Sequence, residues 1–222
     1  MNLKSAILHL DTIDESILSN RCKLVYDDAK VYHTGQVRKY TEEPYHTHLL
    51  AVAMITDLYC SEYNTETKDL FIACAILHDV LEDCSNVSER DIKRTLRKSG
   101  FAFFDRMCIS SAVKDLTNTF TKEAYPELSR EIRKALEANK WSDVYFSRIF
   151  SRHKTMPMIV KCADILHNVH NIVDKDPEFA KVYLYEKMKM VQNMLFEHDI
   201  KQSVIDIINY NIEKLNTNKI GN

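Results

Sequence analysis

The stretch that decides how this chain folds and what chemistry it carries is AILHDVLEDC, residues 75–84. It places His78 and Asp79, and then Glu82 and Asp83 one helical turn later, inside an otherwise apolar run. Burying an ionised group is costly unless the group is paired or bound to a metal. The segment is therefore either an amphipathic helix with a solvated polar face or a helix that holds a site.

Helical geometry favours a shared position for these four side chains. At about 100° per residue, they fall within roughly 140° of one another around a single helix. The residues between them are apolar and supply packing. We therefore expect one continuous helix over about 66–83. In this helix the carboxylates of Glu82 and Asp83 are placed to orient or deprotonate a water molecule.

The composition of the chain indicates one helical domain. A length of 222 residues suffices for a sizeable core, and 45% hydrophobic and 28% charged residues are ordinary for a soluble globular protein. Only 3 glycines and 4 prolines argue against a turn-rich β fold. The net charge of −2 provides no general basic field, so we expect no nucleic-acid partner.

Helical periodicity recurs along nearly the whole chain. Ser88 followed by Asp91 is typical of a capping box, and Gly100 is typical of a helix stop. We expect an all-α fold, a single domain over 1–222 built as a bundle of about ten helices. Their expected ranges are about 15–33, 45–62, 66–83, 89–98, 103–117, 127–139, 141–153, 157–173, 177–197 and 200–216.

The cysteines and the N-terminal segment indicate a cytoplasmic protein. Six cysteines without CxxC spacing lie mostly in apolar contexts, which predicts small buried hydrophobic residues in a reducing compartment. Residues 1–16 lack the apolar stretch of a signal peptide, and no run reaches the roughly 18 apolar residues of a membrane span. We therefore expect no membrane partner.

Two further segments contain residues that bind metals in proteins. EPYHTH, residues 43–48, contains His46 and His48, and KCADILHNVH, residues 161–170, places Asp164 among apolar residues. Imidazole nitrogens and carboxylate oxygens suit a divalent transition ion. Two histidines and two aspartates would leave coordination positions for water and substrate oxygens.

A second His-Asp dipeptide provides an internal comparison. His198 and Asp199 stand near an expected helix end, with no acidic pair after them and no partner segments. We expect no metal there. The ordered combination of segments is what distinguishes residues 75–84 from this dipeptide.

The ordered motifs HTGQVRK (33–39), EPYHTH (43–48), AILHDVLED (75–83) and KCADILHN (161–168) resemble the HD-domain superfamily. Within it they are similar to the RelA/SpoT-type (p)ppGpp hydrolases, including the stand-alone small alarmone hydrolases and the metazoan SpoT homologues. The resemblance covers about 33–170 and leaves about 177–216 as C-terminal helices. It implies an all-α HD fold, one manganese-type divalent ion, and a stringent-response pyrophosphohydrolase that removes the 3′-pyrophosphate from guanosine tetra- or pentaphosphate.

The resemblance also implies roles for individual residues. Four side chains match the metal ligands of the family: His48, His78, Asp79 and Asp164. Glu82 and Asp83 match the catalytic acids that handle the attacking water. Four side chains match contacts to the nucleotide substrate: Arg38, Lys39, Lys161 and Asn168. For Lys161, a structural role beside the metal remains a second interpretation.

Departures from the family pattern leave the substrate open. RKYTEEP (38–44) has one residue more than the common RKSGEP and lacks its glycine, and Leu49 replaces the usual proline. His46 stands at a usually apolar position, as a substrate contact or an exposed residue. The basic side chains of 130–134 are either phosphate contacts or a solvated helix face.

Three functions therefore remain as hypotheses. The first is a metal-dependent (p)ppGpp pyrophosphohydrolase. The second is an HD phosphohydrolase for another nucleotide or a phosphorylated cofactor such as NADPH. The third is a metal-stabilised nucleotide sensor without catalysis. Each has a small-molecule nucleotide as its partner, and a homo-oligomer is left open.

Overall fold

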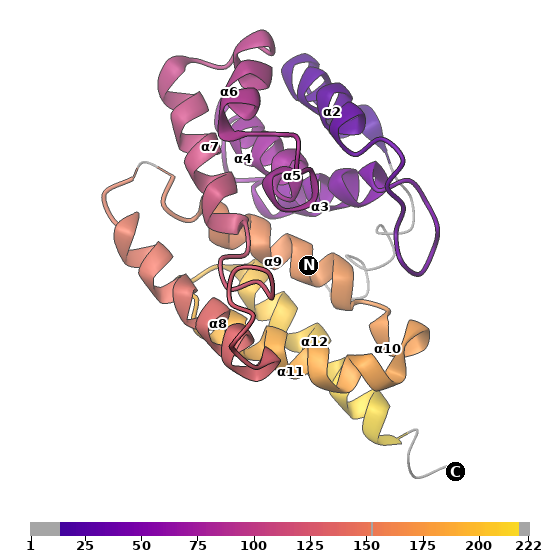
Figure 1. Cartoon of the computed structure of the whole chain (residues 1–222). Coiled ribbons are helices and arrows are strands. Elements are labelled where there is room, and N and C mark those ends of the chain that lie inside the picture. The colour runs from indigo at the N-terminus through magenta and orange to yellow at the C-terminus, as the bar shows by residue number, and fades with distance from the viewer. Residues whose placement is uncertain (1–13, 152, 218–222) are drawn as a thin grey trace. The chain divides into compact units, whose positions relative to one another are not determined.

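The computed structural model describes residues 14–151 and 153–217 of the chain. These residues fold into α-helices joined by loops, and nine of the helices have ten or more residues (Figure 1). Within the described ranges there is no strand, only an isolated bridge between Val37 and Pro44. The expected all-α fold is confirmed. Residues 1–13 lie outside the described residues. The structure therefore does not describe the first part of the expected 1–222 domain or most of the segment that was expected not to be a signal peptide.

The chain divides into two compact units, one up to Thr117 and the other from Asn118 onward. In the first unit the helix of residues 65–77 is central, because it packs against three others. All of its residues from Asp69 to Leu77 are buried, as expected for a helix whose second half is almost entirely apolar. The elements are η1 (Glu15–Ile17), α2 (Asn20–Tyr32), α3 (His46–Tyr59), α4 (Thr65–Leu77), α5 (Val80–Asp83), α6 (Glu89–Lys98) and α7 (Phe103–Leu116).

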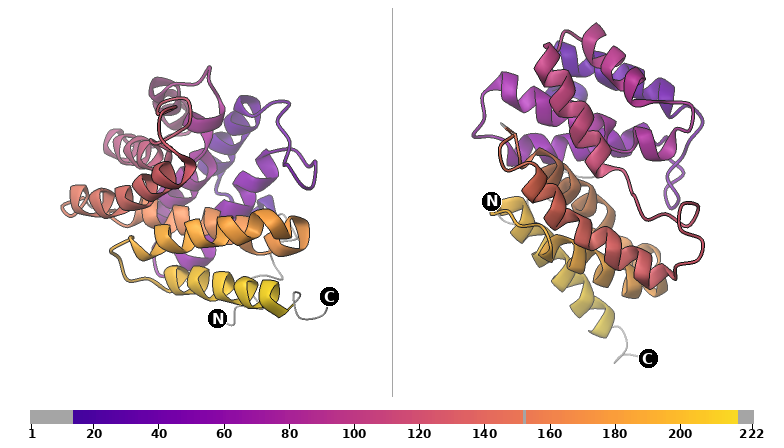
Figure 2. Two further views of the ribbon diagram at one scale, coloured as in Figure 1. Left: turned by 60° about the horizontal axis from the view of Figure 1, so that its bottom comes forward. Right: turned by 60° about the vertical axis from the view of Figure 1, so that its left-hand side comes forward.

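The second unit is built from the remaining helices. Its elements are α8 (Arg130–Ser147), α9 (Met156–Val169), α10 (Ile172–Lys175), α11 (Pro177–Gln192) and α12 (Asp199–Thr217). α9 is buried along nearly its whole length and packs against α12. α11 packs against both α8 and α12, and Figure 2 shows α11 in orange beside α12 in yellow.

Several helix boundaries differ from the sequence prediction. The helix expected over 15–33 is η1 followed by α2, the helix expected over 157–173 is α9 followed by α10, and the helix expected over 177–197 ends at Gln192. The single helix expected over 66–83 is wrong, because α4 ends at Leu77 and α5 begins at Val80. The two helices expected over 127–139 and 141–153 are one helix, α8. The residues around 140 contain no glycine or proline, so nothing in the backbone stops the helix there.

Several local expectations are confirmed. Ser88 and Asp91 form a capping box at the start of α6, and Gly100 ends the following turn with φ of +83°. All six cysteines are free and five of them are buried. Burial raises the pKa of the Cys22 and Cys162 thiols to about 12, so both behave as neutral core residues.

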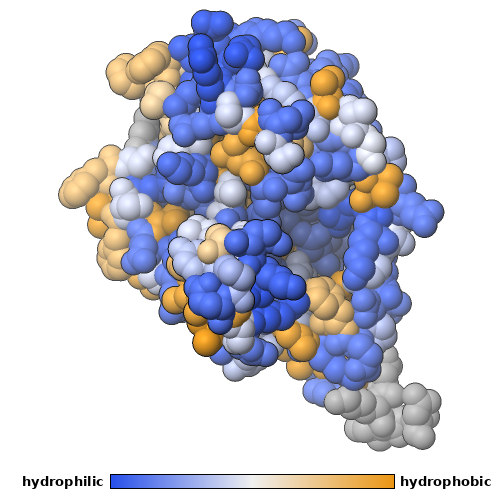
Figure 3. All heavy atoms as spheres, viewed as in Figure 1, coloured by the Kyte–Doolittle hydropathy of each residue, from blue (hydrophilic) through white to orange (hydrophobic). Residues whose placement is uncertain are grey.

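The face of the molecule drawn in Figure 3 is largely polar. Hydrophilic residues cover most of the face drawn in Figure 3, and hydrophobic residues form separate patches on it. Within the described ranges, no helix has both the length and the apolar character needed to cross a bilayer.

Candidate metal centre

The His78–Asp79 pair occupies a break between two helices. His78 is the C-cap of α4, and Asp79 precedes α5 with φ of −99° and ψ of −4°. The carbonyl of Asp79 accepts the N–H groups of Glu82 (3.0 Å) and Asp83 (2.8 Å), so Asp79 also starts the short helix. The prediction that His78, Asp79, Glu82 and Asp83 share one face of a single helix is therefore wrong, because the helix breaks between α4 and α5.

The break brings one carboxylate to two buried imidazoles. Oδ2 of Asp79 lies 2.8 Å from Nε2 of His78 and 3.5 Å from Nε2 of His48, which α3 supplies. The two ring centroids are 5.2 Å apart, and each histidine is only 1% exposed. All three predicted metal ligands in the first unit are thus adjacent.

The protonation of His78 indicates how a cation fits this cluster. Nδ1 of His78 lies 2.7 Å from the carbonyl oxygen of Ala75, a contact that requires the proton to be on Nδ1. If Nδ1 carries the only ring proton, Nε2 of His78 and Oδ2 of Asp79 direct lone pairs at each other over 2.8 Å. Either a second proton on the ring or a metal ion relieves that repulsion. In metal-binding histidines, the ring nitrogen that does not bind the metal commonly donates its N–H to a carbonyl oxygen. The buried group can therefore hold a divalent ion.

A tyrosine completes the support of the Asp79 carboxylate. The Tyr45 hydroxyl donates to Oδ2 of Asp79 at 2.7 Å. Burial, followed by the negative charges of Asp79 and Asp83, raises the pKa of Tyr45, so its hydroxyl stays protonated and remains a donor. Its ring is stacked on His33 at 4.8 Å between centroids.

The HTGQ segment is tied to the end of α5. Nδ1 of His33 lies 2.7 Å from Oε1 of Gln36, and Nε2 of Gln36 donates to the backbone carbonyl of Asp83 at 2.8 Å. The sequence motifs alone do not assign functional roles to His33, Gln36 or Tyr45. The signal was present, because all three belong to the quoted motifs, but their contacts depend on the loop that joins these motifs.

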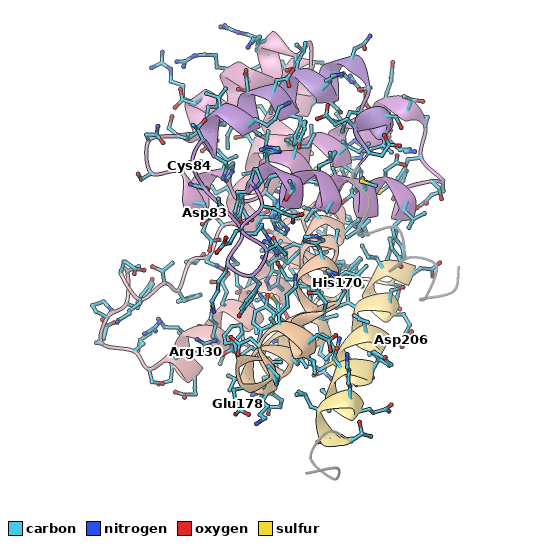
Figure 4. All side chains as sticks on the ribbon, turned by 90° about the vertical axis from the view of Figure 1, so that its right-hand side faces the viewer. Asp83, Cys84, Arg130, His170, Glu178 and Asp206 are labelled. Carbon is cyan, nitrogen blue, oxygen red and sulfur yellow. The ribbon has the colours of Figure 1, made fainter. Side chains whose placement is uncertain are left out.

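The two predicted catalytic acids lie in α5, and both are exposed. Figure 4 labels Asp83 and Cys84 where this helix ends. Desolvation, followed by the charge of Asp79, raises the pKa of Asp83 even though its side chain still reaches solvent. Asp83 therefore retains a proton to a higher pH than an isolated aspartate.

The segment that carries Arg38 and Lys39 folds back on itself. The N–H of Arg38 donates to the carbonyl of Glu43 at 2.8 Å, and the N–H of Tyr45 donates to the carbonyl of Gln36 at 2.9 Å. The Arg38 guanidinium lies 5.9 Å from the centroid of the Tyr45 ring, so it is placed beside the aromatic residue that supports Asp79. Nζ of Lys39 donates to the Tyr40 hydroxyl at 3.0 Å.

The remaining predicted residues belong to α9 in the second unit. Oδ2 of Asp164 accepts from Nζ of Lys161 at 2.8 Å, and Oδ1 accepts from Nδ2 of Asn168 at 2.5 Å. Lys161 and Asp164 are each 5% exposed. Lys161 thus forms a buried ion pair, as its structural interpretation requires, and Asn168 fixes the orientation of the same carboxylate.

Two other candidate groups have structural partners. Nδ1 of His46 lies 2.9 Å from the Tyr26 hydroxyl, and burial, followed by the charge of Lys30, lowers the pKa of His46. In the basic stretch, Arg130 pairs with Glu186, and Arg133 donates to the carbonyl of Leu128. His46 is therefore partly buried and hydrogen-bonded rather than fully exposed. Arg130 and Arg133 each contact a group of the second unit.

Together these features define an all-α protein with a buried histidine–aspartate cluster at a helix break. No family model matches the chain, and no curated protein sequence matches it. A solved structure does: that of a metazoan ortholog of SpoT that hydrolyzes ppGpp and plays a role in starvation responses. The alignment has a TM-score of 0.65 and 20% identity, and it covers 87% of this chain and 96% of that chain. This likeness shows that the two chains share the same all-α fold.

Proposed function

We propose that the protein is a divalent-metal-dependent phosphohydrolase. The observation that carries the proposal is the convergence of His48, His78 and Asp79 on one point, with both imidazoles buried. Asp164 is proposed as the fourth ligand because the KCADILHN motif matches the family at that position. A set of nitrogen and oxygen donors suits manganese and other divalent transition ions.

The residues after the ligands provide the proton chemistry. A bound divalent cation polarises a phosphoryl oxygen and makes water more acidic. Glu82 and Asp83 follow the ligand pair within one turn and stay accessible to solvent, so either carboxylate can accept a proton from an attacking water. The raised pKa of Asp83 brings it closer to neutral pH, where it can also return a proton to the leaving group.

The proposed substrate is guanosine tetra- or pentaphosphate, hydrolysed at its 3′-pyrophosphate to GDP or GTP and pyrophosphate. Two observations support this choice: the four motifs occur in the order of the RelA/SpoT-type hydrolases, and the structural neighbour is described as hydrolyzing ppGpp. Arg38 and Lys39 are proposed to hold the base, and Lys161 and Asn168 to act near the phosphates and the metal. Such an enzyme would work on a soluble nucleotide in the cytoplasm.

The test is a turnover assay with purified protein, Mn²⁺ and ppGpp, with GDP and pyrophosphate separated by chromatography. Glu82→Gln and Asp83→Asn should each bind Mn²⁺ and lose at least about a hundredfold in rate, the usual contribution of a general acid or base. Glu66→Gln, an exposed carboxylate at the start of α4, is the matched control and should keep the wild-type rate. Absence of GDP with bound metal rejects this substrate.

One observation favours a different nucleotide on the same scaffold. In the loop that carries Arg38, Glu42 adopts φ of +58°, and this segment has one residue more than the common family sequence and lacks its glycine. A loop with a different course would present a different base-binding surface. A panel of ppGpp, NADPH and common nucleotides tests this, because a tenfold preference for another substrate, about 1.4 kcal/mol in the barrier, would establish it. Binding without turnover of any of them would instead identify a sensor.

A further inference from the structure

The corner at which α6 leads into α7 carries exposed apolar side chains. Phe103 and Phe104, the first two residues of α7, are 60% and 83% exposed, and Met107, one turn further on, is 42% exposed. Phe101, just before them, is 2% exposed and holds the turn in the core. Figure 3 shows hydrophobic side chains projecting at the upper left, where α7 begins in Figure 1, next to strongly hydrophilic ones. We call the three exposed side chains the α7 tip.

The chain from Glu89 to Met107, which forms α6 and the start of α7, is basic. It holds six cationic side chains and three carboxylates, a formal charge of +3, so the net charge of −2 leaves −5 for the rest of the chain. The six cations are Arg90, Lys93, Arg94, Arg97, Lys98 and Arg106. The positive charge is therefore local to the segment that carries the α7 tip.

Ion pairs neutralise only part of this charge. The pairs are Lys93 with Glu89, Arg94 with Asp91, and Lys98 with Asp28 of α2. Asp91 also feels the charge of Arg90, so one carboxylate faces two cations. Arg97 is exposed and forms no ion pair with any residue of 14–151 or 153–217. When Asp28 is counted with the segment, six cations still face four carboxylates, an excess of two positive charges.

The cations reach the apolar side chains. The Arg106 guanidinium lies 5.7 Å from the centroid of Phe103, and Nη1 of Arg106 donates to the carbonyl of Phe101 at 2.8 Å. Arg97 is in the last turn of α6, and its carbonyl accepts the N–H of Gly100 in the turn that leads to α7. The corner therefore combines an apolar projection with a basic flank.

We propose that this corner binds the surface of a bilayer that contains anionic phospholipids. Phe103 and Phe104 insert below the headgroups, and Arg90 and Arg97 remain among the headgroup phosphates. Apolar side chains beside arginines and lysines are the combination that holds interfacial helices on anionic membranes. The N-cap of α7, Ala102, has no side chain that could accept the first N–H groups of the helix, so lipid phosphates can also accept them.

The size of the α7 tip favours a bilayer over a folded protein partner. At 150–250 Å² for a whole aromatic side chain, the exposed parts of its three side chains amount to roughly 300–400 Å². A stable protein interface takes about 800 Å² from each partner, usually with matched shapes. A fluid bilayer can close around a small projection without a matching groove. The contact needs no spanning helix, whose absence was the reason to expect no membrane partner.

The experiment is co-sedimentation of the full-length protein with sucrose-loaded vesicles. The vesicles contain either phosphatidylcholine alone or three parts of phosphatidylcholine to one part of phosphatidylserine. The protein should sediment with the mixed vesicles along a saturable curve and bind pure phosphatidylcholine at least about tenfold more weakly, because that surface lacks the anionic headgroups. No sedimentation with the mixed vesicles, or equal binding to both, would overturn the proposal.

Variants test the two parts of the corner separately. Phe103→Ser combined with Phe104→Ser should weaken binding to the mixed vesicles by at least about tenfold, whereas leucine at both positions should keep most of it. Arg90→Gln combined with Arg97→Gln should also weaken it by at least about tenfold. Unchanged binding in either the serine pair or the glutamine pair would contradict the assignment. Thermal unfolding of each variant should match the wild type, because all four side chains are exposed.

Matched controls remove the same kinds of side chain elsewhere. Val182→Ser combined with Tyr185→Ser changes two exposed apolar positions of α11, and Lys122→Gln combined with Lys175→Gln removes two exposed charges of the second unit. Neither should change vesicle binding, and equal weakening by the controls would overturn the proposal. Polyglutamate tests an acidic polypeptide as the occupant. If its binding is lost in the serine pair of the α7 tip, such a polypeptide replaces the bilayer as the partner.

Discussion

The hydroxyl of Tyr45 donates a hydrogen bond of 2.7 Å to Oδ2 of Asp79. That oxygen is also the one nearest to His48 and His78, so a residue from the loop before α3 positions the carboxylate of the helix break. The tyrosine is itself held by its stacking on His33. The proposed ligands therefore depend on a loop residue that is not a ligand.

Removal of this hydroxyl should weaken metal binding without removing any ligand. We expect Tyr45→Phe to raise the dissociation constant for Mn²⁺ by about 10- to 100-fold, the usual effect of losing a hydrogen bond to a metal ligand. Isothermal titration calorimetry measures the change directly. Tyr40→Phe, which removes the hydroxyl that accepts from Nζ of Lys39 at 3.0 Å, is the control and should leave the constant unchanged. If Tyr45→Phe binds Mn²⁺ with wild-type affinity, Tyr45 does not position the Asp79 carboxylate for the metal.

The two His-Asp dipeptides should respond differently to metal. We expect Mn²⁺ at a hundredfold excess over its dissociation constant to stabilise the wild type by about 2.7 kcal/mol, and chelator to reverse the gain. His78→Gln should lose most of this stabilisation. His198→Gln should keep it, because Nδ1 of His198 accepts the N–H of Ile200 at the start of α12, a contact that needs no metal. Thermal unfolding with and without Mn²⁺ distinguishes the two dipeptides when each variant is compared with its own metal-free form. An equal loss of metal-dependent stabilisation in both variants would refute the proposed site at His78.

Features with a local cause were predictable from the sequence. The helix over 89–98 was predicted at its observed bounds, because the capping box and Gly100 mark its two ends chemically. The candidates His48 and His78 could be selected because each stands beside apolar residues and belongs to an ordered motif.

Features with a tertiary cause were not predictable from the sequence. The apolar periodicity of 66–83 continues across His78 and Asp79, so the sequence contains no stop signal where α4 ends. The carboxylate of Asp79 is instead held by contacts to Tyr45 and His78, which arise only when the loop and α4 have packed. A pattern of residues along one helix cannot report such contacts.

The loop that carries Arg38 contains a strained residue. Glu42 has φ of +58°, a left-handed conformation that costs a residue with a Cβ about 1–2 kcal/mol. Glycine avoids this cost but loses more backbone entropy on folding, about 0.5–1 kcal/mol. We therefore expect Glu42→Gly to stabilise the protein by about 0.5–1 kcal/mol in urea denaturation. Glu43→Gly, one residue further on without a positive φ, should destabilise it, and equal destabilisation by both variants would contradict the interpretation.

A buried carboxylate closes the loop before α8. Oε2 of Glu137 accepts the N–H groups of Thr119 (2.9 Å) and Phe120 (3.1 Å), and Lys140 pairs with the same side chain. Burial alone would raise the pKa of Glu137, but Lys140 and the two N–H groups outweigh it, so the pKa lies below its ordinary value of 4.5. The folded protein therefore holds this group charged at pH values where the unfolded chain has already taken up a proton.

The sign of this shift determines how stability depends on pH. A lowered pKa contributes stability that is fully present above pH 4.5 and is lost as the pH falls toward the folded-state value. We expect Glu137→Gln to cost roughly 1–3 kcal/mol at pH 7, because a charged hydrogen-bond acceptor is removed from a buried position, and to cost less as the pH falls below 4.5. Glu127→Gln, an exposed position in the same loop, should cost nothing at either pH. Urea denaturation at pH 7 and pH 4 measures the difference, and a penalty that stays constant with pH would show that Glu137 acts through packing rather than charge.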